Sequence, residues 1–159
     1  MICDECQALY EEVGDRVRDA EVFVKVRRHD EALVCRADIE ESEASYRVEV
    51  GEEHDVVWVG LYTEDRWLSE SIEADVMFRG DKLPELLEDE LYDQGFEGRL
   101  PVDHFRNESK EYVFRSPVFL PEDEELDGAP MIRRVTQVLL AYEAMFRELG
   151  EMAGEDLVG

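Results

Sequence analysis

Five short segments with strand-like patterns follow one another between residues 21 and 78, and no helical pattern separates them. Apolar and polar side chains alternate in most of them, as at Val22, Val24 and Val26, and this alternation is the period of a strand with one buried face. The segments cover residues 21–27, 33–39, 46–50, 56–62 and 72–78. Strands joined in succession by short turns favour an antiparallel sheet over a doubly wound parallel one.

Three further segments place apolar residues at the three- and four-residue spacing of a helix. They cover residues 2–17, 81–94 and 132–149. Gly95 stands where a left-handed residue would end the second helix, and the third begins near Pro130 and is expected to stop at Gly150.

The stretch 98–107 is expected to be irregular, and 111–120 is predicted to be a strand in which Pro117 marks an edge or a bulge. The whole pattern predicts an α+β fold of two layers, an antiparallel β-sheet packed by three helices. We expect one domain over residues 1–150 and a frayed tail at 151–159.

Acidic residues dominate the composition, with 42 Asp and Glu against 17 Lys and Arg and a formal net charge of −25. This charge repels phosphate backbones and anionic lipid, so it argues against nucleic acid or a membrane surface as partner. Only three cations are lysines, and the acids are spread over every segment. Two explanations remain open: adaptation of the whole surface to molar salt, which we favour, or an arginine-rich codon bias combined with an acidic function such as nucleic-acid mimicry.

Cys3 and Cys6 form a C-x-x-C pair close to residue 1. Two thiolates at that spacing can share one metal ion, and His29 with Cys35 could complete a tetrahedral zinc site. A thiol-redox pair is a second possibility, although the two acidic residues between the cysteines disfavour thiolates. The third interpretation, which we favour, makes Cys6 and Cys35 small buried hydrophobes.

No recognisable motif points to catalysis. The sequence has three histidines at predicted turns, no G-x-S-x-G elbow and no glycine loop for phosphate. We therefore expect a non-catalytic protein without a cofactor or a defined small-molecule substrate. The acidic first residues and the lack of a long apolar run predict neither a signal peptide nor a membrane span, and hence a cytoplasmic protein.

The predicted elements offer more apolar surface than a two-layer core needs. Strand 56–62 is apolar on both faces, and the stripe of the last helix is wide. The tract 65–80 combines aromatic, Met and Arg residues, which are enriched at protein interfaces. The candidate partner-binding residues are Trp58, Trp67, Met77, Tyr142 and Phe146.

The order of the predicted elements is itself informative. The chain has an N-terminal amphipathic helix, a meander around 56–62, a helix at 83–91, an aromatic strand at 112–119 and a closing helix with Val138-Leu139-Leu140-Ala141-Tyr142. This order, over most of the chain, resembles the YbjN-like proteins, whose fold is similar to that of type III secretion chaperones. The chain departs from the family pattern in having five predicted strands before the second helix, where about three are expected, and one after it, where two are expected.

The resemblance implies a non-enzymatic homodimer that holds a partner polypeptide. We therefore expect a chaperone-like or adaptor protein with an acidic, salt-adapted surface. The alternative is a small metal-binding or thiol-redox protein that uses Cys3, Cys6 and Cys35.

Overall fold

The computed structural model describes residues 4–29, 31–36, 45–63 and 83–158. The helices and strands of these residues are α1 (Asp4–Asp19), β1 (Lys25–His29), β2 (Ala32–Arg36), β3 (Ser45–Val50), β4 (Val56–Thr63), α3 (Leu83–Asp93), β5 (Asp103–Arg106), β6 (Tyr112–Phe119) and α4 (Ala129–Val158).

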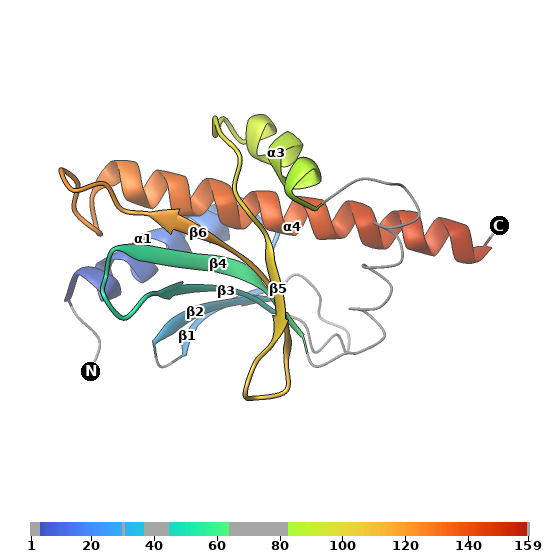
Figure 1. Cartoon of the computed structure of the whole chain (residues 1–159), viewed down its shortest axis with the longest axis horizontal. Coiled ribbons are helices and arrows are strands. Elements are labelled where there is room, and N and C mark those ends of the chain that lie inside the picture. Colours follow the sequence, from blue (N-terminus) through green and yellow to red (C-terminus); the bar gives the residue numbers. More distant parts are fainter. Residues whose placement is uncertain (1–3, 30, 37–44, 64–82, 159) are drawn as a thin grey trace.

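All six described strands form one sheet, in the order β1-β2-β3-β4-β6-β5, and every neighbouring pair is antiparallel. Helices α1 and α4 lie on one face of this sheet, and α3 packs against α4 (Figure 1). The predicted fold class is thus confirmed: the described residues form an α+β fold with an antiparallel sheet and three helices.

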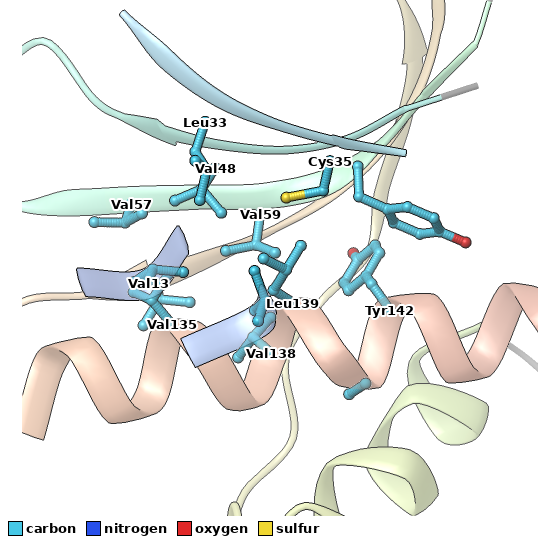
Figure 2. Packing of buried hydrophobic residues seen from close by; sticks show 14 of the residues in the cluster. Val13, Leu33, Cys35, Val48, Val57, Val59, Val135, Val138, Leu139 and Tyr142 are labelled. Carbon is cyan, nitrogen blue, oxygen red and sulfur yellow. The ribbon is translucent and has the colours of Figure 1, made fainter. Parts of the chain in front are cut away.

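The core lies between the sheet and the two helices that cover it. Figure 2 shows valine and leucine side chains of α1 and α4 meeting those of the strands. The contributors include Val13, Leu33, Val48, Val57, Val59, Val135, Val138 and Leu139, all fully buried. Each such side chain stabilises the fold by about 1.5–3 kcal/mol relative to an exposed one, so the α4 stripe anchors the helix to the sheet.

Tyr10 ties α1 to the sheet through its hydroxyl group. The hydroxyl donates a hydrogen bond to the carbonyl of Glu31 at 2.6 Å and accepts one from the backbone N–H of Val50 at 2.8 Å. Its ring is buried among the apolar residues of α1. One side chain therefore contributes to the core and also satisfies two backbone groups at the ends of β2 and β3.

Strand β5 was not predicted, because 98–107 was expected to be irregular. All four of its residues are exposed, so it shows no alternation of apolar and polar side chains. It forms by pairing with β6, from Asp103 opposite Arg115 to Arg106 opposite Tyr112. The part of the chain after α3 therefore has two strands rather than one. Pro117 lies past the last β6 residue that pairs with β5, which confirms its placement at a local edge.

Helix α4 continues to Val158 and does not stop at Gly150. A glycine inside a helix costs about 1 kcal/mol relative to alanine, and the glutamate, methionine and alanine residues beside it are strong helix formers that offset this cost. The frayed tail expected at 151–159 is thus helical through Val158. The end of α3 follows the prediction, since Gly95 has a left-handed φ of 85°. The predicted strand at 72–78 lies outside the described residues.

Two acidic side chains, Glu90 of α3 and Glu148 of α4, share a hydrogen bond where these helices pack. Burial, then this hydrogen bond, then the charges of Glu148 and Asp93 raise the pKa of Glu90 to about 7, and Arg147 partly opposes them. Because the folded-state pKa is the higher one, protonation stabilises the fold. That stability is fully present below the ordinary glutamate pKa of 4.5 and is lost as the pH rises through 7.

We therefore predict that Glu90→Gln raises the stability at pH 8, by about 1 kcal/mol after allowance for solvent screening, and leaves the stability at pH 5 nearly unchanged. Thermal melts followed by circular dichroism at pH 5, 6.5 and 8 measure the effect. Asp89→Asn, at an exposed position on the same helix, is the matched control. Identical pH profiles for the wild type and Glu90→Gln would contradict the assignment.

Candidate functional site

The structure separates the residues that were predicted to bind a partner. Trp58 lies on β4 and is half-buried on the face of the sheet opposite α4. Tyr142 and Phe146 lie in the core, with exposed fractions of 0% and 7%. Trp67 and Met77 lie outside the described residues.

Tyr142 and Phe146 are held in the core by specific contacts. The Tyr142 hydroxyl is 2.6 Å from the hydroxyl of Ser116 on β6. The ring of Phe146 packs at a tilt against the rings of Phe114 and Tyr142, with centroids 5.5 and 5.9 Å apart. Their side chains therefore join α4 to the sheet and are not presented on the surface of the described fold.

The described cysteines do not assemble a metal site. Cys6 is buried in α1 and is disulfide-bonded, whereas Cys35 is a buried free thiol on β2. Burial raises the pKa of Cys35 to about 12, so its thiol stays protonated near neutral pH and is a poor metal ligand. Within the described ranges no three His, Cys, Asp or Glu residues are placed to hold a metal ion. Cys3 and the side chain of His29 lie outside the description.

The sheet has two chemically different faces. Leu33, Val48 and Val59 are paired in register and point toward the helices. The next row of register partners, one residue further along the strands, lies on the opposite face. It consists of Arg27 on β1, Val34 on β2, Arg47 on β3, Gly60 on β4, Arg115 on β6 and Asp103 on β5. Helices α1 and α4 do not cover this second face (Figure 1). Three arginines therefore lie on one line across the sheet.

The described strands are basic although the chain is strongly acidic. Their acidic residues are Glu49 and Asp103 alone. Their seven basic residues are Lys25, Arg27, Arg28, Arg36, Arg47, Arg106 and Arg115. Since the whole chain carries −25, the sheet is a cationic layer in an anionic molecule.

Arg115 is the centre of this face. Its guanidinium carbon lies 4.0 Å from the ring centroid of Trp58 and 4.9 Å from that of Phe105, so two aromatic rings flank one cation. Its Nε is buried without a hydrogen-bond partner in the described structure. Among the described ranges no carboxylate lies within ion-pair distance of it. Arg115 is thus stacked between two rings, and its register partner on β5 is Asp103, which does not come within ion-pair distance.

Arg47 is fixed differently, by a partner in the loop before β6. Its two terminal nitrogens contact the two carboxylate oxygens of Glu111 at 3.1 and 2.5 Å, and its guanidinium lies 4.5 Å from the ring centroid of Tyr62. A bidentate pair of this kind orients a guanidinium strongly. The pKa of Tyr62 is raised by burial, and the nearby Arg115 and Arg47 partly offset that rise.

One end of the face is covered and the other is accessible. Ser45, Tyr62 and Val113, which lie in one register row, are all buried. At the opposite end Phe119 is 67% exposed, and its register partner Val56 is half-buried. Phe105, on the edge strand, is 37% exposed. We call the group Arg27, Arg47, Trp58, Phe105, Arg115 and Phe119 the arginine–aromatic surface.

Only Trp58 of this surface was found from the sequence. The arginines occupy the polar positions of alternating segments, where a solvated face is expected. The charge count was not a usable signal, because the predicted strand segments also contain acids, namely Glu21, Asp38, Glu49, Glu73, Asp75 and Glu111. The line that Arg27, Arg47 and Arg115 form depends on strand order and register, which a single sequence does not contain.

In the described part of the chain, no helix has the length and apolar character needed to cross a membrane. No family model matches the chain, and neither the curated proteins nor the solved structures include a match. The resemblance to the YbjN-like proteins and to secretion chaperones therefore stays a prediction.

Proposed function

We propose that this protein is a non-catalytic, chaperone-like or adaptor protein of the cytoplasm, and that it binds a partner polypeptide through the arginine–aromatic surface. The observation that carries the proposal is the position of Trp58, Arg115, Phe105 and Phe119 on a face that α1 and α4 leave uncovered. Tryptophan and arginine are the residues that most often dominate the binding energy of protein interfaces.

The composition of this surface supports a polypeptide as the partner. Aromatic rings and arginines are enriched at interface cores, whereas Lys, Glu and Asp are depleted there. The described strands show the same bias, since they contain one lysine and two acids. The acids on the remaining elements keep the molecule soluble, so the surface can stay exposed until a partner arrives.

Phe119→Ser tests the proposal with little risk to the fold, because this side chain is already 67% exposed. Immobilised wild-type protein is incubated with an extract of the source organism at its own salt concentration, and retained polypeptides are identified by mass spectrometry. We expect a polypeptide to be retained in a fixed stoichiometry, and Phe119→Ser to reduce its recovery by roughly tenfold, the effect of losing one anchoring side chain. The purified partner is then recombined with the protein to confirm the complex.

Tyr92→Ser is the matched control, since Tyr92 is a 76% exposed aromatic on α3, away from the sheet. It should retain the partner as the wild type does. Equal recovery with all three proteins, or no specific retention by the wild type, would contradict the proposal. Light scattering on the purified wild-type protein at the same salt concentration tests whether it forms the homodimer that the resemblance implies.

The metal-binding or thiol-redox alternative has its own measurement. Elemental analysis of protein purified without chelator, with titration of free thiols, reports metal content and the state of the cysteines. Stoichiometric zinc would favour the alternative over the partner-binding proposal.

A further inference from the structure

The line of arginines has a defined spacing. Arg27 and Arg47 are two strands apart, as are Arg47 and Arg115, and neighbouring strands lie about 4.8 Å apart. The backbone position of Arg47 therefore lies about 10 Å from that of Arg27 and about 10 Å from that of Arg115, and the whole line spans about 19 Å of the sheet. Gly60 separates Arg47 from Arg115, so no side chain stands between them on β4.

The three arginines of this line differ in how much of their positive charge a ligand can reach. Arg27 is exposed on the edge strand. Arg115 lacks a described carboxylate partner and is stacked between two rings. Arg47 is paired with Glu111, which neutralises part of its charge and holds its plane over Tyr62. A ligand lying along the row thus meets the exposed cation of Arg27 at one end, and at the other end the cation of Arg115, whose register partner on β5 is Asp103.

We infer that the arginine–aromatic surface binds an acidic segment of the partner polypeptide, laid across the strands along Arg27, Arg47 and Arg115. Apolar side chains of the same segment would rest on Trp58 and Phe119. The inference rests on the proposed function and adds the chemistry of the ligand.

Charge complementarity selects this occupant. Elsewhere the molecule is acidic, so a basic partner would bind the remaining surface in preference to the sheet. In dilute salt a long polyanion such as single-stranded nucleic acid meets the repulsion of the −25 charge beyond the row, whereas a short segment ends within the row. A short segment with a few carboxylates and aromatic or aliphatic side chains matches both the cations and the rings of the surface.

The test uses fluorescence anisotropy at fixed potassium chloride concentration with the full chain. The probe is a labelled 15-residue peptide in which glutamate alternates with phenylalanine, serine and leucine. Two comparison probes are the same peptide with lysine in place of glutamate and a labelled 15-nucleotide oligothymidylate. We expect saturable binding of the acidic peptide and weaker binding of both comparison probes. Affinity should fall as salt is added, because part of it is electrostatic.

Two variants locate the binding. Arg27→Gln, at an exposed position, should lower the affinity for the acidic peptide by roughly fivefold, and Arg115→Gln should lower it by more than about tenfold. Arg133→Gln removes an exposed arginine of α4 and should leave the affinity unchanged. Because Arg115 also stacks on Trp58, a thermal melt accompanies each variant, and Arg27→Gln keeps the test decisive if Arg115→Gln does not fold.

Equal affinity of wild type and Arg27→Gln for the acidic peptide would overturn the inference. Preference for the lysine peptide or for the oligothymidylate would overturn it as well. If the capture experiment with Phe119→Ser succeeds and the acidic peptide does not bind, the ligand chemistry is wrong and the proposed function stands. If both fail, the proposed function fails too.

Discussion

Replacing Gly60 by alanine is expected to destabilise the fold by about 3 kcal/mol or more, at or above the upper end of the usual cost of overpacking. A Cβ atom at this position would collide with the carbonyl oxygen of Phe114 and lie 2.6 Å from the Cβ of Arg115. Both obstacles are on β6, and neither can be removed by rotating a flexible side chain. The strands β4 and β6 must therefore separate, and their eight paired positions include the centre of the sheet.

Gly14→Ala is the matched control for this prediction. Its Cβ would have no neighbour closer than 3.5 Å, and the position is inside α1. Alanine there should be neutral or stabilise the fold by up to about 1 kcal/mol, because glycine is a poor helix former. Urea unfolding followed by circular dichroism gives both values. A denaturation midpoint for Gly60→Ala equal to that of the wild type would show that β4 and β6 do not approach each other as described.

Removing salt is the second change with a large expected effect. At −25 the folded chain repels itself, and potassium chloride near 1 M shortens the screening length to about 3 Å. We expect the melting temperature to rise by more than about 10 °C between 0.05 and 2 M potassium chloride, which corresponds to roughly 3–5 kcal/mol for a chain of this size. Differential scanning calorimetry at a series of salt concentrations measures it.

Sucrose separates screening from a general excluded-solute effect. It strengthens burial by exclusion from the surface but does not screen charge. At matched osmolarity it should therefore raise the melting temperature much less than potassium chloride does. An unchanged melting temperature across the salt series would remove salt adaptation and leave codon bias with an acidic function as the explanation of the charge.

Most of the fold followed from periodicity, and its exceptions have physical causes. Segment 56–62 was predicted to be a strand, and it forms β4, which pairs with β3 along one edge and with β6 along the other. β5 gave no signal because its four exposed residues are held by pairing with β6. Gly150 is a helix-ending signal, and it was overridden by the strong helix formers beside it. Local patterns therefore predicted elements that bury a face and missed the element that depends on a neighbour.

The site was less predictable for a related reason. A wide apolar stripe on the last helix indicated spare surface at Tyr142 and Phe146. In the structure α4 is covered by the sheet and also by α3, so a wide stripe is what its core packing requires. The functional surface instead combines Trp58 with arginines from β1, β3 and β6. Their common line exists only in the assembled sheet.

Site-specific photo-crosslinking tests the partner-binding face most directly. The photoreactive residue benzoylphenylalanine is placed at Phe119 in one protein and at Tyr92 in another, both exposed aromatic positions. Each protein is irradiated in an extract of the source organism, and the products are identified by mass spectrometry. We predict a crosslinked polypeptide at position 119 and none at position 92. A crosslink at position 92 without one at 119 would contradict the assignment of the open sheet face as the binding surface.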